Sequence, residues 1–337
     1  VNKSAYRALI KFTDEELDYI CRFVEEKVQT LGIQDVPIAE MHNVVEGALE
    51  KVNPVVAKSY RDYRNYKQDF VQMLDEVYKK SQSIMYIGDK ENSNTDSALV
   101  STKRSLIFNE LNKELYKKFF LTVEEIQAIR EGYIYIHDMS ARRDTMNCCL
   151  FDVKNVLSGG FEMGNLWYNE PKTLDTAFDV IGDIVLSAAS QQYGGFTVPS
   201  VDEILEPYAE KSHKKLIEKY RALGLDEEAV QKIAWSDLEK EMEQGFQGWE
   251  YKFNSVSSSR GDYPFITVTA GTRTSIYGKL ATIKMLEVRK NGQGKEGHKK
   301  PVLFPKIVFL YDENLHGPGK PLEDVFEAGI ECSRKTM

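Results

Sequence analysis

The sequence predicts an α/β fold preceded by an all-helical region, and three observations carry this prediction. From Thr13 to about Lys80, apolar residues recur every three or four positions, which is the spacing of helices. After residue 131 the period changes, and the runs GYIYIHD and MNCCLFDV are short and apolar, as strands are. From there to the end, strand patterns alternate with long helical ones, which is typical of parallel strand-helix-strand units.

Composition limits the class of function. The chain has 337 residues, of which 42% are hydrophobic, so it can bury a large core, and its length favours two or three domains. A formal net charge of -8 argues against a surface for duplex nucleic acid. Four cysteines without a CxxC pair, no leader with a cleavage site and no run long enough to span a bilayer together predict a reducing, cytoplasmic compartment with no membrane partner.

Helices are expected first. One begins at Thr13 or Asp14 as N-cap, and its apolar stripe holds Leu17, Ile20, Cys21, Val24 and Val28. Cys21 is therefore expected in the core. A second helix follows Pro37, and a third follows Pro54 and runs through VYKK.

The polar turn GDKENSNTDS separates these helices from two more, at 101 to 120 and 122 to 131. GYIYIHD and MNCCLFDV are then expected as neighbouring strands with His137 and Cys148 opening toward one cavity. A helix from about Leu174 to Gln192 stops at two glycines. The remaining elements are helices at 201 to 222, 226 to 248 and 274 to 288, and strands in PFITVTAGT and VLFPKIVFLY.

Two adjacent thiols, Cys148 and Cys149, lie in the second apolar run. Successive side chains of a strand point to opposite faces, so at most one of them faces a given pocket, and the pair cannot readily form a disulfide. His137 on its own would be read as a turn histidine satisfied by Asp138, and it becomes a candidate only together with other motifs.

These motifs form an ordered series: His137-Asp138, Asn147-Cys148, GGFEMGN, QQYGG, and SSSRGDYPF through FPKIVF. In this order and spacing they resemble the large subunit of the anaerobic (class III) ribonucleotide reductase, a glycyl-radical enzyme. KENSNTDS at 90 to 97 resembles the Asn-rich segment before that family's barrel, and HNVVEGALEKVNPVVAKSYRDYR resembles the last helices of its ATP-cone domain. The resemblance covers essentially the whole chain.

The resemblance implies three parts: a partial ATP cone over 1 to 66, a helical linker and N-terminal helical region over 67 to 131, and the first half of a ten-stranded ribonucleotide reductase and formate-lyase type α/β barrel over 132 to 337. It also implies catalytic roles for Cys148, as the reducing-side thiol facing the pocket, and for Asn147, which could bond a sugar hydroxyl. Cys149 would then pack behind the strand.

Further site residues follow from the same resemblance. His137, Ser258, Ser259, Arg260, Gly194 and Gly195 are expected to bind substrate, and Glu170 and Lys172 to bind the deoxynucleotide effector. Arg260 could equally be a surface residue of a polar loop, and Lys172 a solvated charge near a helix end. A phosphate cradle in GGFEMGN is disfavoured, because this segment does not run from strand to helix, and its glycines are better explained by a tight turn and close backbone approach.

The implied cofactors and partners are a glycyl radical, ATP or dATP and dNTP effectors, formate or a thiol reductant, a radical-SAM iron-sulfur activating enzyme, ribonucleoside triphosphate substrates and a second copy in a homodimer. The thiyl cysteine, the radical glycine and a zinc-binding cysteine cluster of the family have no counterpart here, since Cys332 lies in a helical pattern. The chain is therefore expected to be an internal, inactive piece with no metal site of its own. Two alternatives stay open: another glycyl-radical enzyme of the formate-lyase type, and a nucleotide-sensing module without catalysis.

Overall fold

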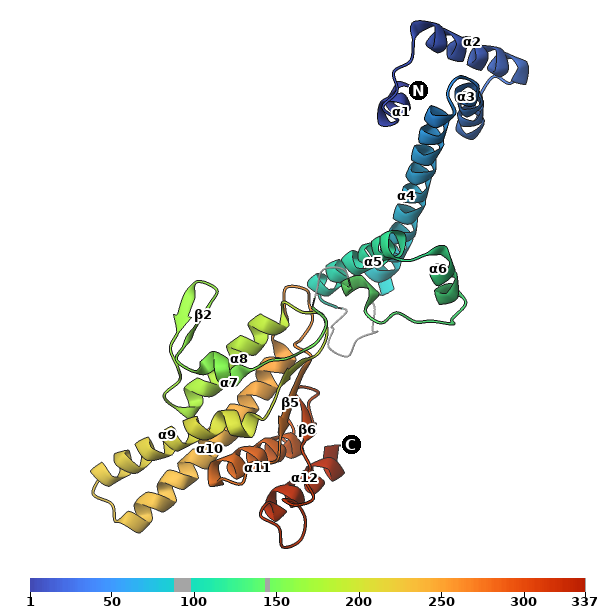
Figure 1. The fold of residues 1–337 in the computed structure, drawn as a ribbon. Coiled ribbons are helices and arrows are strands. Elements are labelled where there is room, and N and C mark those ends of the chain that lie inside the picture. Colours follow the sequence, from blue (N-terminus) through green and yellow to red (C-terminus); the bar gives the residue numbers. More distant parts are fainter. Residues whose placement is uncertain (88–97, 143–145, 337) are drawn as a thin grey trace. The chain divides into compact units, whose positions relative to one another are not determined.

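The structure is a computed structural model that describes residues 1 to 87, 98 to 142 and 146 to 336. The Asn-rich segment at 90 to 97 lies outside the described residues. The chain divides into two compact units, Val1–Gln82 and Ser83–Met337. Each is helix-rich, and the sheet belongs to the second unit (Figure 1).

The first unit is built from α1 (Asn2–Arg7), α2 (Asp14–Leu31), α3 (Ile38–Val52) and the start of α4 (Pro54–Ile87). A capping box between Thr13 and Glu16 begins α2, as the sequence predicts. Ile20 is buried, but Cys21 is exposed, so the prediction of a core position for Cys21 is wrong. α2 packs mainly against α3, and the Cys21 side chain, about 100° round the helix from the buried Ile20, faces away from this core.

The second unit opens with α5 (Val100–Phe120) and α6 (Val123–Arg130), close to the predicted bounds. GYIYIHD does not form the predicted strand. The backbone N–H of Tyr133 donates a hydrogen bond to the Ala128 carbonyl at the end of α6, and the Tyr133 and Tyr135 side chains are exposed. Alternating apolar residues make a strand only where a neighbouring strand supplies hydrogen-bond partners, and here the segment leads instead into the short 3-10 helix η1 (Met139–Ala141).

Four parallel strands form the main sheet: β1 (Cys149–Leu150), β4 (Phe196–Val198), β5 (Ile266–Ala270) and β6 (Lys306–Phe309). Their order in the sheet is also their order in the chain. When successive right-handed crossover connections all move in the same direction across a parallel sheet, their helices lie on the same face of it. The fold class is thus confirmed as α/β with a parallel sheet.

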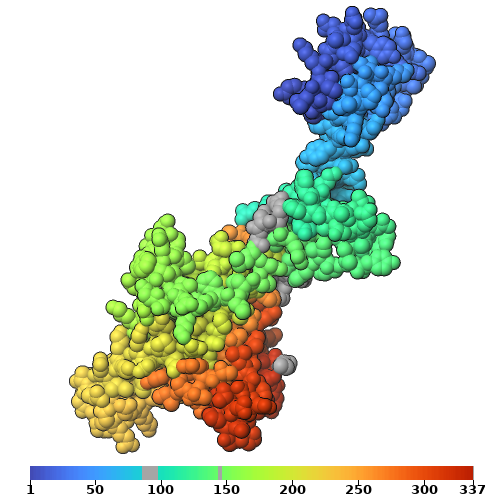
Figure 2. Space-filling view, viewed as in Figure 1, coloured from blue at the N-terminus to red at the C-terminus, as the bar shows by residue number. Residues whose placement is uncertain are grey.

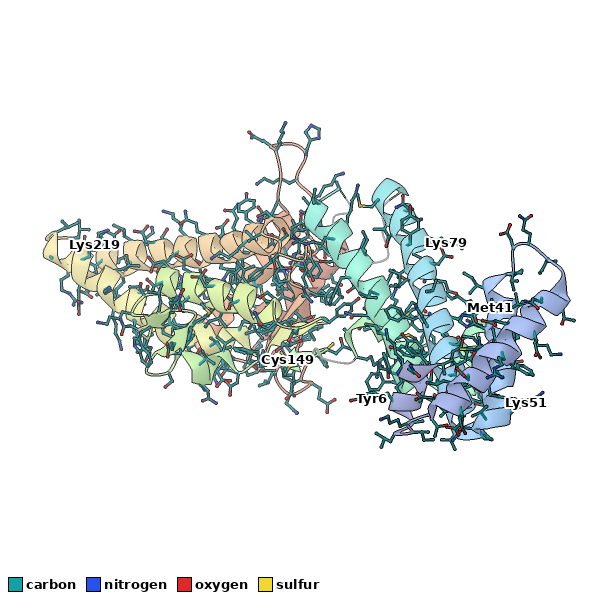
Figure 3. All side chains as sticks on the ribbon, turned by 90° about the horizontal axis from the view of Figure 1, so that it is seen from above. Tyr6, Met41, Lys51, Lys79, Cys149 and Lys219 are labelled. Carbon is teal, nitrogen blue, oxygen red and sulfur yellow. The ribbon has the colours of Figure 1, made fainter. Side chains whose placement is uncertain are left out.

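The helices of that face are α8 (Leu174–Ala189), α9 (Val201–Ala222), α10 (Glu227–Ser255) and α11 (Ile276–Asn291), with α7 (Val153–Leu157) and α12 (Glu323–Thr336) completing the unit. Figure 1 shows α9 and α10 side by side, and Lys219 marks their far end, well away from Cys149, in Figure 3. One apolar core joins these helices to the inward residues of the strands, among them Phe196, Ile266 and Val268.

Strand register explains which side chains face the helices. Cys149 pairs with Phe196, and Phe196 with Ile266, and all three point to the helical core. The alternate positions, Leu150, Thr197 and Thr267, therefore share the opposite face. A buried ion pair between Arg289 and Glu250 helps to fix α11 against α10 behind this sheet.

A hairpin that the sequence did not predict follows α7. It consists of β2 (Phe161–Met163) and β3 (Leu166–Tyr168), joined through Gly164 at a φ of 64°. A side chain at Gly160 would lie 2.6 Å from the Tyr168 carbonyl oxygen, so the close backbone approach expected for these glycines is present. In the space-filling view the hairpin stands out from the helices as a lobe (Figure 2).

Candidate active site

A cavity of about 320 Å³ lies where several segments of the second unit meet. Three of these segments end just before a strand: Asn147-Cys148 before β1, Gly194-Gly195 before β4, and Arg260 to Phe265 before β5. Parallel pairing brings the amino ends of the three strands together, which explains how residues far apart in sequence line one space. The rest of the lining comes from α5 and from His137 and Asp138.

The two adjacent thiols point in different directions. Cys148 is exposed, lines the cavity and accepts a hydrogen bond at its Sγ from the Gly195 N–H at 3.2 Å. Cys149 packs against the helical core and donates from its Sγ to Gln192 Oε1 at 2.9 Å. Burial raises the pKa of Cys149 and keeps it a thiol. These directions agree with the sequence-based expectation, whereas the chemical role of Cys148 stays a prediction.

His137 and Cys148 line the same cavity, although His137 does not lie on a neighbouring strand as predicted. The His137 ring is largely exposed, and its Nε2 lies 3.3 Å from Asp138 Oδ2. Asn147 also lines the cavity, and its carbonyl accepts from the Gly194 N–H at 2.6 Å. The Asn147 side chain lies against Gly194, where a Cβ atom would come too close to Asn147 Oδ1.

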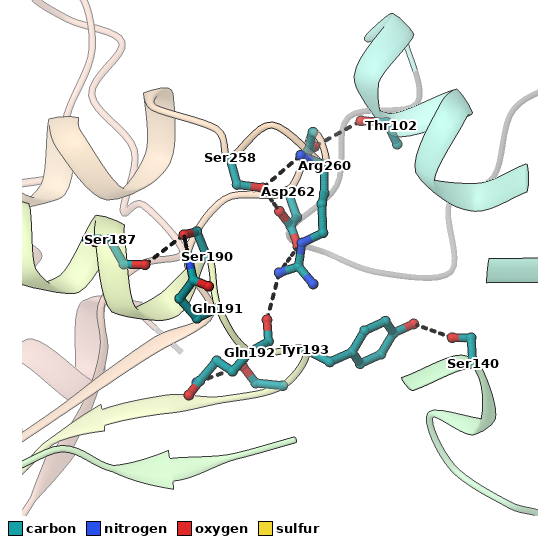
Figure 4. Close-up of polar contacts among 12 residues, drawn as sticks. Thr102, Ser140, Ser187, Ser190, Gln191, Gln192, Tyr193, Ser258, Arg260 and Asp262 are labelled. Atoms are coloured by element: carbon teal, nitrogen blue, oxygen red, sulfur yellow. Dashed lines mark hydrogen bonds and ion pairs between the residues drawn. The ribbon is translucent and has the colours of Figure 1, made fainter. Parts of the chain in front are cut away.

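Arg260 is held in place rather than free in solvent (Figure 4). Its guanidinium donates to the Gln192 carbonyl at 2.6 Å and pairs with Asp262 at 3.0 Å, and the Ser258 hydroxyl bonds Asp262. The Arg260 Nε is buried and has no hydrogen-bond partner among the described residues. Arg260 lines the cavity, while Ser258 lines a smaller adjoining pocket.

Ser259 differs from its neighbours in the loop. It is exposed, is not among the described residues that line the cavity, and its carbonyl accepts a hydrogen bond from Arg104 of α5 at 3.1 Å. The Thr102 hydroxyl of α5 donates to the Gly261 carbonyl, two residues further along the loop, at 2.9 Å. The polar loop is therefore fastened to α5 from outside.

Sequence reasoning missed the contribution of α5 to the cavity. Thr102, Ser105, Leu106 and Asn109 all line it. Their spacing of three and four predicts one face of a helix, and a face with Ser, Thr and Asn on it differs from an ordinary core stripe. That polar stripe was the available signal, but which segment it would meet depends on tertiary packing.

The predicted effector residues lie elsewhere. Glu170 accepts from the Gly159 N–H and pairs with Lys211 of α9 at 3.1 Å, contacts that lower its pKa, and Lys172 is exposed. The first backbone donors of α8 are already engaged, because Leu174 N–H bonds Ser212 and Asp175 N–H bonds Glu241. The structure thus does not bring Glu170 or Lys172 into the cavity with Cys148.

Among the described residues, no group of three or more His, Cys, Asp or Glu side chains could hold a metal ion. Within the same parts of the chain, no helix has the length and apolar character needed to cross a membrane.

Comparison with known proteins matches both units. Residues 91 to 337 match the family model described as anaerobic ribonucleoside-triphosphate reductase, and residues 1 to 69 match that of the ATP cone domain. Curated relatives with the name anaerobic ribonucleoside-triphosphate reductase include those of Haemophilus influenzae, 31% identical over 90% of this chain and 43% of the relative, and of Escherichia coli, 30% identical over 100% of this chain and 48% of the relative.

Solved structures give the same fold. The anaerobic ribonucleotide reductase from Thermotoga maritima with citrate in the active site matches 81% of this chain and 52% of its own, with a TM-score of 0.52 and 15% identity. The form with dATP bound in the specificity site also matches with a TM-score of 0.52, at 16% identity over 81% of this chain and 49% of its own. The chain spans about half the length of the curated relatives it matches.

Proposed function

Because this chain belongs to the anaerobic ribonucleoside-triphosphate reductase family, we propose that it takes part in reducing ribonucleoside triphosphates to deoxyribonucleoside triphosphates by a glycyl and thiyl radical mechanism under nucleotide control. The observation that carries the proposal is the thiol of Cys148, which opens into a cavity beside Asn147 and His137. Family membership sets aside the formate-lyase alternative, since the matching relatives are reductases.

In this proposal Cys148 is the reducing-side thiol. Replacing the ribose 2′-hydroxyl by hydrogen releases water and consumes two electrons, and an S–H bond is weak enough to give up a hydrogen atom and be restored by formate or a thiol reductant. The glycyl radical of the family would generate the thiyl radical that starts the reaction. Cys148 suits the later step because its sulfur is exposed to the cavity, unlike the buried Cys332.

The other lining residues would bind and orient the nucleotide. Asn147 and His137 offer polar groups for the ribose hydroxyls, and the glycines at 194 and 195 let the backbone approach the ligand closely. Arg260 supplies the positive charge for the triphosphate, with Ser258 fixing its loop and Ser259 acting only through its carbonyl. The bond to the Gln192 carbonyl and the ion pair with Asp262 support this role, because they hold the Arg260 guanidinium at the cavity wall.

Nucleotide control would follow the division into a partial ATP cone (1 to 66), a helical linker (67 to 131) and a half-barrel (132 to 337). The ATP-cone match supports ATP or dATP as an effector. Glu170 and Lys172 are proposed for a separate dNTP effector site, since neither lines the cavity described above.

A homodimer, a radical-SAM iron-sulfur activating enzyme and a cytoplasmic location are proposed from the family alone. A non-catalytic nucleotide sensor remains the second candidate. The ATP-cone match favours it to the same extent as it favours the reductase, so the decisive question is what the cavity binds.

Substrate protection tests the proposal. A ribonucleoside triphosphate such as CTP should slow alkylation of Cys148 by iodoacetamide, whereas exposed Cys21, which is in the other unit, serves as an internal control that CTP leaves unchanged. Arg260→Met should remove the protection at equal CTP. Lack of protection at saturating nucleotide, with the protein folded, would contradict the assignment of this cavity to substrate.

A further inference from the structure

A single peptide group, between Gly194 and Gly195, lies between Gln192 and the sulfur of Cys148. Its carbonyl accepts a hydrogen bond from Gln192 Nε2 at 3.3 Å, and its N–H donates to Cys148 Sγ at 3.2 Å. In a planar trans peptide the C=O and N–H point in opposite directions. A side chain that holds the carbonyl therefore also aims the N–H.

This peptide needs such a hold. It joins two glycines, whose backbone torsions are the least restricted. The preceding amide is fixed by Gly194 N–H to the Asn147 carbonyl at 2.6 Å, and the following carbonyl by Cys149 N–H to Gly195 O at 3.0 Å. Among the described residues, the hydrogen-bond partners of the peptide plane between them are Gln192 on one side and Cys148 on the other.

Gln192 is well placed for this task. It is 3% exposed, and its own carbonyl is held by Arg260 at 2.6 Å. The Cys149 thiol donates to its Oε1, so the amide nitrogen faces the Gly194 carbonyl; the reversed amide would set two oxygens against each other. Cys149 thus orients Gln192, and Gln192 orients the peptide that contacts Cys148.

We propose that Gln192 is a positioning residue for Cys148, holding the Gly194–Gly195 peptide so that its N–H donates to the Cys148 sulfur. This hydrogen bond fixes the rotamer of the Cys148 side chain, and with it the direction in which the sulfur faces the cavity. This inference rests on the proposed role of Cys148 in the reaction, but it concerns the state of the thiol itself and is tested without turnover.

The test is the rate of iodoacetamide alkylation at Cys148 in the 337-residue chain, resolved from Cys149 by fragment-ion mass spectrometry, between about pH 6 and pH 10. Gln192→Met keeps the length of the side chain and removes both hydrogen bonds. We expect Cys148 to react about fivefold more slowly near neutral pH, the effect of losing one hydrogen bond of ordinary strength.

Gln191→Met is the matched control, because Gln191 is exposed and its side-chain amide donates to the Ser190 hydroxyl rather than to the Gly194 carbonyl. It should leave the alkylation rate of Cys148 unchanged. Gln192→Glu keeps an acceptor for the Cys149 thiol, but an ionised Glu has no hydrogen to donate to the Gly194 carbonyl. It should therefore also slow the alkylation of Cys148. This variant replaces Gln192→Met if the latter does not fold.

A purely structural role of Gln192 would lower the melting temperature of the variant and leave the alkylation rate of Cys148 unchanged while the protein is folded. That result in a folded variant, or a faster Cys148, would overturn the proposal. Failure of CTP to protect Cys148 would count against the proposed function alone, because the alkylation profile contains no nucleotide.

Discussion

The buried ion pair between Arg289 and Glu250 gives the sharpest test of how the second unit is held together. Arg289 Nε lies 2.7 Å from Glu250 Oε1, and the two side chains are 10% and 4% exposed. Arg289 also donates to the Pro305 carbonyl at 2.6 Å, just before β6, and Gln293 donates to the second Glu250 oxygen at 2.7 Å. The pair thus connects α10 and α11 to the last strand of the sheet.

Arg289→Met should cost about 3–5 kcal/mol of unfolding free energy, because it leaves the Glu250 carboxylate buried without its cation. The double variant Glu250→Gln with Arg289→Met removes both charges. It should cost only about 1–2 kcal/mol, mainly for the Pro305 carbonyl that loses its donor. The difference between the two, not the size of either, is the prediction.

Tryptophan fluorescence during urea unfolding is a suitable assay, because all three tryptophans lie in the second unit, at positions 167, 235 and 249. The Arg289→Met midpoint should fall by about 1–2 M urea. Arg334→Met, in an exposed pair with Glu331, is the control and should change the free energy by under about 0.5 kcal/mol. If the double variant is as unstable as Arg289→Met, the cost does not come from an unpaired buried charge and the reasoning fails.

Three further predictions concern single residues. Gly194→Ala should destabilise the second unit by about 1–3 kcal/mol, since its Cβ would lie 2.6 Å from Cys148 Sγ. Gly248→Ala lies in a helix, with nothing within 4 Å of its Cβ, and should stabilise the unit by about 0.5–1 kcal/mol. Thermal unfolding compares the two variants. Burial raises the pKa of Glu241. Protonation of Glu241 therefore stabilises the fold fully at pH values below the ordinary glutamate pKa, and this contribution is lost as pH rises through the folded-state pKa. Glu241→Gln should therefore be more stable than the wild type near neutral pH, with the gap shrinking in acid, and a constant gap would contradict the sign. Cys148 should be alkylated well before Cys332, which is buried and whose pKa burial raises; mass spectrometry showing the reverse order would refute the assignment of exposure.

Helices were the part of the fold that the sequence predicted best. Thr13 with Glu16, and Thr122 with Glu125, form capping boxes, and such local signals depend on residues within one turn. The strand in PFITVTAGT was also predictable, because its buried positions alternate over the whole of β5. These features are determined by near neighbours in the chain.

The errors have a common cause in tertiary context. GYIYIHD has a strand pattern but no partner strand, and Cys21 lies on an apolar stripe that α3 covers only in part. The β2–β3 hairpin was hidden by strands of three residues, too short to show a period. In the cavity, the opposite directions of Cys148 and Cys149 followed from strand geometry, but Gln192 and the polar face of α5 could be found only once the segments were seen together.

The consecutive order of the four strands has a consequence for how the second unit is made. β1, β4, β5 and β6 join the sheet in the sequence in which a ribosome would deliver them, each beside the strand completed just before. No early strand has to wait exposed for a late one to insert beside it, and every crossover helix covers the strand pair it connects as soon as that pair exists. The sheet can therefore assemble step by step during synthesis, each new strand pairing with an edge that is already formed.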